Sequence, residues 1–152
     1  MNKKILSFIT DGRKFLALRN NFKDTKHGGD FWFVVTGFLK NNESLGQAVK
    51  REIKEETNLE IMDMLDLNWC SIYKWLNEDC IEYNFIAFIR KGEVILNEEK
   101  IEYKWLSLKE FVKLIKWEDD KALLGHVLKK ALKKEVYFKE KNIFDYRKLK
   151  ES

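Results

Sequence analysis

The sequence predicts an α+β protein in which helices cover both faces of a mixed β-sheet. Three observations favour this class: β-like runs come first, a single helical segment interrupts them, and further β-like runs precede the last helices. A regular alternation of strands and helices would instead favour a doubly wound parallel sheet. The observed order therefore favours an αβα sandwich whose sheet is at least partly antiparallel.

The first β-like runs cover residues 5–10 and 15–19, and a third covers residues 31–36. The first two flank Asp11-Gly12-Arg13-Lys14, a sequence typical of a hairpin in which Asp-Gly supplies positive φ angles. Residues 20–30 are polar and contain a Gly-Gly pair, so they predict a loop long enough to border a site.

A helix is predicted over residues 44–57. Leu45, Val49 and Ile53 recur every four residues, which places them on one face of a helix. Ser44 precedes the first of them and is a suitable N-cap. This segment is therefore the first helix of the chain.

The second half of the chain predicts three more strands and two more helices. The strands cover about residues 67–76, 80–89 and 101–106, and the helices residues 108–115 and 119–134. The sequence has no proline, no internal repeat and no Gly/Ser-rich linker to mark a boundary. We expect one domain over residues 1–152, with a basic helical tail from about residue 134.

The composition favours a folded protein outside the membrane. Of the 152 residues 45% are hydrophobic and 14% aromatic, which is unlike a disordered chain. No apolar run approaches the roughly 20 residues that span a bilayer. Cys70 and Cys80 are too few for a disulfide framework, so a reducing cytoplasm is the expected compartment.

The end of the chain is basic. Residues 129–152 contain nine Lys or Arg and four Asp or Glu, a balance of +5, whereas the whole chain carries +4. Such a segment can bind nucleic acid, but a lysine-rich final helix is more often a solvated face. The basic tail therefore leaves nucleic acid as a possible partner that is not favoured.

Three carboxylates lie together on the first predicted helix. Glu52, Glu55 and Glu56 share a sector that adjoins the apolar stripe, where like charges repel strongly. A bound cation resolves this repulsion, and Mg²⁺ is a hard ion that takes carboxylate oxygens and bridges to phosphates. The alternative is an ordinary surface of weak ion pairs, in which Arg51 pairs with Glu55 or orients another carboxylate.

Residues 37–59 resemble the Nudix box, GX5EX7REUXEEXGU, where U is aliphatic. All specified positions but one match, and Asn58 stands where the family usually has Gly. Asn is the next most tolerant residue in the left-handed conformation that ends helices. Phe38 and Asn42 replace glycines that are frequent in relatives, which leaves the path of the preceding loop less defined.

This resemblance implies an αβα sandwich with a loop-helix-loop metal site that hydrolyses a diphosphate linkage. It implies Mg²⁺, or alternatively Mn²⁺, as the cofactor. Water is then the nucleophile, activated beside metal ions that neutralise the phosphate charge. The implied metal ligands are Glu52, Glu55, Glu56 and the carbonyl of Gly37. The resemblance also implies that Arg51 holds a carboxylate of the helix and that Glu43 stabilises the loop or joins the metal shell. The general base is then Glu56 or Glu99.

Two further segments, residues 31–37 and 102–106, look like the bacterial dATP/dihydroneopterin triphosphate pyrophosphohydrolase branch. In that branch an acidic residue precedes the Tyr-Lys-Trp segment, which favours Glu99 over Glu98. The lack of proline argues against an ADP-ribose substrate. Dinucleoside polyphosphates and the 5′ end of RNA are the remaining alternatives.

The expected partner is a small nucleotide substrate, bound by a monomer or a homodimer. Trp32 is a candidate for stacking on its base, although most tryptophans here are expected in the core. His27 lies in the loop before the box and can reach phosphate. Glu43 completes the candidate substrate-binding residues.

Overall fold

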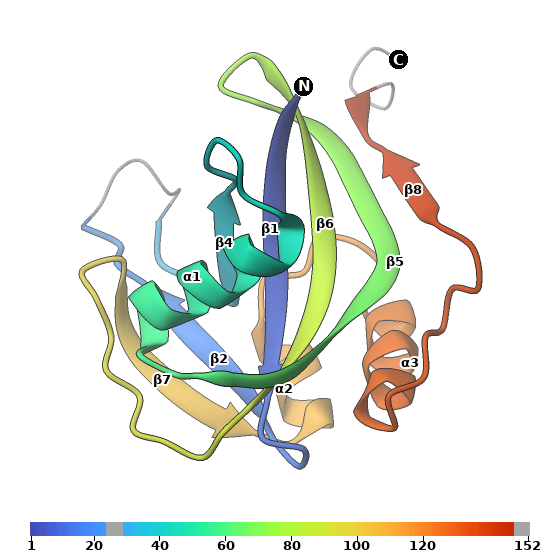
Figure 1. The fold of residues 1–152 in the computed structure, drawn as a ribbon. Coiled ribbons are helices and arrows are strands. Elements are labelled where there is room, and N and C mark those ends of the chain that lie inside the picture. The colour runs from blue at the N-terminus through green and yellow to red at the C-terminus, as the bar shows by residue number, and fades with distance from the viewer. Residues whose placement is uncertain (24–28, 148–152) are drawn as a thin grey trace.

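The computed structural model describes residues 1–23 and 29–147. Within them a sheet of eight strands is covered by three helices (Figure 1). The strands are β1 (Asn2–Thr10), β2 (Phe15–Asn20), β3 (Trp32–Phe33), β4 (Val35–Phe38), β5 (Ile61–Trp75), β6 (Glu78–Ile89), β7 (Lys100–Leu106) and β8 (Asn142–Asp145). The helices are α1 (Leu45–Thr57), α2 (Leu108–Leu114) and α3 (Lys121–Leu132).

The sheet is mixed, as the sequence predicted. Its strand order is β3-β2-β1-β6-β5-β8, with β4 paired to β1 and β7 paired to β2. The pairs β1–β6 and β5–β8 are parallel, whereas the other pairs are antiparallel. In the turn between β1 and β2 only Gly12 has a positive φ, and the Asp11 carboxylate instead accepts hydrogen bonds from two following backbone N–H groups.

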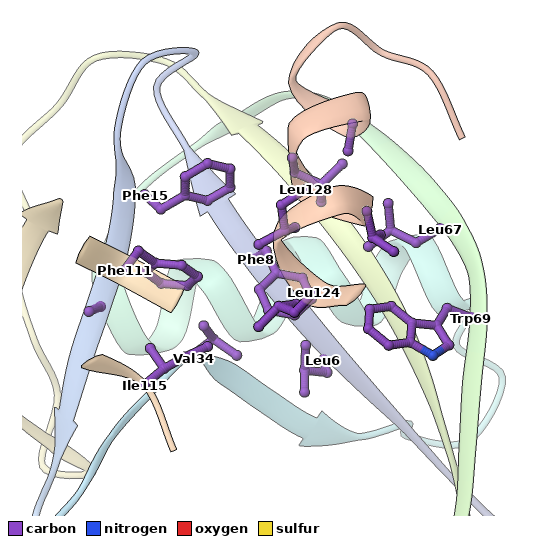
Figure 2. Packing of buried hydrophobic residues seen from close by; sticks show 14 residues of the cluster. Leu6, Phe8, Phe15, Val34, Leu67, Trp69, Phe111, Ile115, Leu124 and Leu128 are labelled. Carbon is purple, nitrogen blue, oxygen red and sulfur yellow. The ribbon is translucent and has the colours of Figure 1, made fainter. Parts of the chain in front are cut away.

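Side chains of β1 alternate between two hydrophobic cores, one on each face of the sheet. Ile5 and Ile9 pack with α1, whereas Leu6 and Phe8 pack with α2 and α3. Figure 2 shows this second core, which includes Phe8 of β1 and Leu124 of α3. Helices therefore cover both faces, and the molecule has the expected α+β sandwich. No helix in the described part of the chain is long and apolar enough to cross a membrane.

Helix α1 begins and ends where its capping residues predict. The Ser44 hydroxyl accepts from the Gln47 N–H, and the Gln47 side chain accepts from the Ser44 N–H, which completes a capping box. Asn58 ends the helix with φ 66°, in the left-handed region. Val49 and Ile53 are fully buried, each contributing roughly 1.5–3 kcal/mol to packing against the sheet.

Several strand boundaries differ from the prediction. The predicted strand 31–36 is two short strands, β3 and β4, which pair with β2 and β1 respectively. Strand β5 starts at Ile61, six residues before the predicted start. Its register with β6 shifts between Asp66 and Cys70, so the apolar alternation is interrupted there and the first half is hard to recognise.

The prediction of a helical tail from about residue 134 is wrong for its described part, residues 134–147, which contains no α-helix. Helix α3 ends at Leu132, and Lys134 has φ 60°, which stops the helix. The chain then returns along the sheet as β8, parallel to β5 (Figure 1). Aromatic contacts hold this segment against β5: the Trp69 ring lies 5.6 Å from the Phe138 ring and 6.5 Å from the Phe144 ring.

Candidate active site

Strand β4 places Gly37 directly against the first acid of α1. A Cβ atom at Gly37 would lie 2.2 Å from the Glu52 carboxyl carbon, far inside van der Waals contact. Gly37 is held in place because it pairs with Ile5 of β1. The absence of a side chain at this position therefore lets the Glu52 carboxylate lie against the backbone of β4.

Glu52 and Glu56 form a carboxylate pair in which Glu56 is buried and Glu52 is partly buried. Glu56 is only 1% exposed, and its Oε2 atom has no hydrogen-bond partner among the described residues. Burial raises the pKa of both groups, and that of Glu56 the more strongly. Two interacting carboxyl groups with an unpartnered buried oxygen are costly to fold, so a ligand of opposite charge would relieve the cost.

Lys100 is the cation beside this pair. Its Nζ atom lies 4.0 Å from Glu56 Oε1, and both side chains are largely buried. Burial lowers the pKa of Lys100, and the charge of Glu56 opposes that change. Sequence reasoning passed over Lys100, although it immediately follows Glu99 and opens β7.

Arg51 connects the loop before α1 to the acids. Its Nε atom donates to Glu43 at 2.7 Å, its Nη1 atom to Glu52 at 2.7 Å and its Nη2 atom to the Phe38 carbonyl at 3.0 Å. A longer contact of 3.4 Å joins Nη1 to Glu55. Arg51 thus contacts Glu55 and holds Glu52, so both roles weighed from the sequence are present.

Glu43 holds the loop by two kinds of bond. Its carboxylate binds Arg51 and also accepts from the backbone N–H of Lys40 at 3.0 Å. The hydrogen bond from Arg51 lowers the pKa of Glu43 to about 2. In the same loop Asn42 has φ 62°, so an asparagine replaces the frequent glycine in a conformation that it tolerates.

The three acids of the helix do not all converge. Glu55 is 50% exposed and contacts Arg51, whereas Glu52 and Glu56 lie together. Among residues 1–23 and 29–147, no group of three or more His, Cys, Asp or Glu side chains is arranged to hold a metal ion. The pair nevertheless fits a divalent cation, since Glu56 offers a buried oxygen without a partner.

Three further residues were predicted from the sequence to belong to the site: Glu99, Trp32 and His27. Glu99 is close enough for its charge to raise the pKa of Glu56, after the larger effect of burial. Trp32 lies in β3 with Lys104 Nζ 4.9 Å from its ring centre, and it packs against the core on the α2 and α3 face. His27 lies outside the described residues.

An acid-bearing helix thus follows a strand that contains Gly37, and it packs on a mixed sheet. The model of the NUDIX domain matches residues 3–126. The chain therefore belongs to the NUDIX domain family.

Curated relatives match this chain at low identity and over part of their own length. A NAD-capped RNA hydrolase NudC from Mannheimia succiniciproducens is 27% identical over 108 residues, which are 70% of this chain and 39% of that protein. The chain thus spans about two fifths of the length of the curated relatives that it matches.

Solved structures share the fold over most of their length. A MutT protein from Methanosarcina mazei has a TM-score of 0.63 at 25% identity, covering 74% of this chain and 81% of that one. The E. coli dihydroneopterin triphosphate pyrophosphohydrolase has a TM-score of 0.60 at 21% identity, covering 82% and 92%. The second likeness concerns the fold alone.

Proposed function

We propose that this protein hydrolyses a diphosphate linkage of a nucleoside triphosphate or a related nucleotide. The reaction would require a divalent metal ion, for which Mg²⁺ is the first candidate. The observation that carries this proposal is the Glu52–Glu56 carboxylate pair: Glu56 has a buried oxygen without a partner among the described residues, and the Glu52 carboxyl group lies against Gly37. Membership of the NUDIX domain family supports it.

Glu52 and Glu56 would hold the metal ion, with Glu55 and the carbonyl of Gly37 as further oxygen ligands. When bound, the ion supplies positive charge for the diphosphate oxygens and lowers the pKa of a nearby water. Arg51 keeps the Glu52 carboxylate in place through its 2.7 Å bond. Glu56 or Glu99 would accept the proton of the attacking water.

A deoxynucleoside triphosphate or dihydroneopterin triphosphate is the first substrate to test. Residues 102–106, which led to this expectation, lie on β7, the strand that Lys100 opens beside Glu56. Glu56 therefore lies beside the start of the strand that carries this segment.

The test is a panel of nucleotides incubated with Mg²⁺ or Mn²⁺ and separated by chromatography. Monophosphate and pyrophosphate should appear, and Glu56→Gln should lower turnover by roughly 10²-fold or more. Glu60→Gln is the matched control, because Glu60 is an exposed glutamate just after the same helix. Turnover that survives in Glu56→Gln would contradict the proposal.

An RNA 5′ end is the second candidate substrate. Two observations favour it: the curated relatives are named NAD-capped RNA hydrolases, and α3 presents a basic hollow. This hollow is lined by His126, Lys129, Lys130, Lys133, Glu135 and Tyr137. Binding of 5′-triphosphate or NAD-capped RNA should weaken steeply with salt, and Lys129→Gln/Lys130→Gln/Lys133→Gln should reduce that dependence. Equal binding by the triple variant would remove this candidate.

A further inference from the structure

A second polar cluster lies on the sheet face opposite α1. Lys4 alternates with Leu6 and Phe8 along β1, so it lies on the face of the second core. Lys4 Nζ is 3.8 Å from Glu82 Oε2 of the adjacent strand β6. The Tyr73 hydroxyl of β5 donates to the same Oε2 atom at 3.0 Å. Lys4, Glu82 and Tyr73 are all separate from the Glu52–Glu56 pair of α1.

Asn84 follows Glu82 by two residues on β6, on the same face. It is 0% exposed, and neither its amide nitrogen nor its amide oxygen has a partner in the described structure. A buried polar group without a partner costs about 1–3 kcal/mol, so a leucine would be more stable here. An amide kept at such a cost points to a ligand that supplies both a donor and an acceptor.

Two aromatic rings stand beside this cluster. The Phe38 and Trp75 ring centres are 5.1 Å apart, and Lys4 Nζ lies 5.4 Å and 5.8 Å from them. Exposure decreases from Trp75 at 36% to the Glu82 side chain at 12% and Asn84 at 0%. The cluster therefore leads from an aromatic rim to a polar interior, as a site for a flat polar ring would.

The cluster also adjoins the candidate active site. Phe38 directly follows Gly37, whose backbone touches Glu52, and the Phe38 carbonyl accepts from Arg51 at 3.0 Å. Gly37 and Phe38 point to opposite faces of β4, a strand that pairs with β1. Besides burial, the charge of Lys4 nevertheless contributes to lowering the pKa of Lys100, which lies 4.0 Å from Glu56, so the two clusters are close in space. A nucleotide with its phosphates at Glu52 and Glu56 would pass round β4 to place its base toward Phe38 and Trp75.

The hydrogen-bonding groups select one kind of ring edge. Both contacts of the Glu82 carboxylate use Oε2, which leaves Oε1 to accept from a ligand. A carboxylate accepts well from two adjacent N–H groups, and an amide can donate to a neighbouring carbonyl. The 2-amino-4-oxopyrimidine edge, found in guanine and in pterins, offers that combination. The adenine edge offers an acceptor where this edge has its ring N–H.

We propose that Glu82 and Asn84 bind the 2-amino-4-oxopyrimidine edge of a guanine or pterin substrate whose ring lies against Phe38 and Trp75. This inference rests on the proposed function and names its substrate class.

The test measures binding without metal, so that it does not depend on hydrolysis. Isothermal titration calorimetry with GMP, IMP, AMP and neopterin should show binding of GMP, neopterin or both at least about tenfold tighter than of IMP and AMP. IMP lacks only the 2-amino group of GMP. The ratio of GMP to neopterin affinity distinguishes a guanine nucleotide from a pterin.

Two variants and one control test the residues. Glu82→Gln should reduce the preference for GMP over IMP to about twofold or less, because it replaces an acceptor with a donor. Asn84→Leu should raise the melting temperature of the free protein and weaken binding about tenfold. Glu78→Gln, an exposed glutamate on the same strand, should change neither property.

Equal binding of all four ligands would overturn the inference. So would an Asn84→Leu variant with a lower melting temperature and unchanged binding, since Asn84 would then have a structural role. Hydrolysis without base preference would defeat this inference alone. A preference for GMP in a protein that hydrolyses no triphosphate would defeat the proposed function instead.

Discussion

The α-carbon of Gly37 packs against the carboxyl group of Glu52, with no room for a methyl group between them. Gly37→Ala should therefore displace the Glu52 carboxylate and lower kcat by roughly 10²-fold, the usual cost of a misplacement of about 1 Å. The matched glycine is Gly46, where a Cβ would meet only Met64 Sδ at 3.6 Å. Gly46→Ala should keep its turnover and gain about 0.5–1 kcal/mol of stability, because Gly46 lies in α1. Full activity of Gly37→Ala would show that Glu52 is not held by this contact.

The ion pair of Glu43 with Arg51 makes the folding stability of the protein depend on pH. Its pKa is lowered to about 2 in the folded protein by Arg51, from an ordinary value of 4.5. The stabilisation is therefore complete above about pH 4.5 and is lost as the pH falls through 2. Urea denaturation should show Glu43→Gln less stable than the natural protein at pH 6, with the difference shrinking between pH 4 and pH 2. A difference independent of pH would mean that charge at Glu43 is not the cause.

Lys100 should matter most in the absence of metal. Lys100→Met leaves Glu56 buried without its neighbouring cation, and breaking a buried pair costs up to roughly 3–5 kcal/mol. The loss should be smaller than this, because Glu56 can take up a proton. Added Mg²⁺ should raise the melting temperature of Lys100→Met more than that of the natural protein, since the metal ion then replaces the missing charge. Lys104→Met, in the same strand but beside Trp32, is the control.

Asn58 is the one departure from the family pattern, and its conformation predicts how substitutions behave. With φ 66° it adopts the left-handed conformation that glycine adopts without cost. Asn58→Gly should change the melting temperature little, whereas Asn58→Ala should lose roughly 1 kcal/mol. Thermal unfolding followed by circular dichroism would measure both. A stable Asn58→Ala variant would contradict this account of the helix end.

Local signals were sufficient for the first helix and most strands. The spacing of Val49 and Ile53 and the cap at Ser44 depend on neighbouring residues only, and both appear in the structure as expected. β8 could not be predicted in this way, because its partner Trp69 is about seventy residues earlier in the chain. Pairings over such separations leave no local periodicity.

The same distinction applies to the candidate site. The helical period placed Glu52 and Glu56 on one side of α1, and the structure has them together. The helical period also placed Glu55 on that side. It could not show that the Glu55 side chain would instead contact Arg51 and remain half exposed, apart from Glu52 and Glu56. Lys100 was missed because its position depends on how β7 lies beside α1, which is a property of the tertiary structure.

The pairing of β8 with β5 has a practical consequence for any shortened version of this protein. Arg147 binds Asp79 at 2.7 Å and Tyr146 binds Asp119, so the end of the described chain is fastened at two points. Removing these residues would uncover the outer N–H and C=O groups of a long strand, together with the ring of Trp69. Such an open border invites self-association between molecules. In an RNA-binding assay, a protein truncated after α3 would therefore aggregate, and aggregation could be mistaken for a change in RNA binding. Substitutions that remove charge without removing β8 are the better test of the basic end.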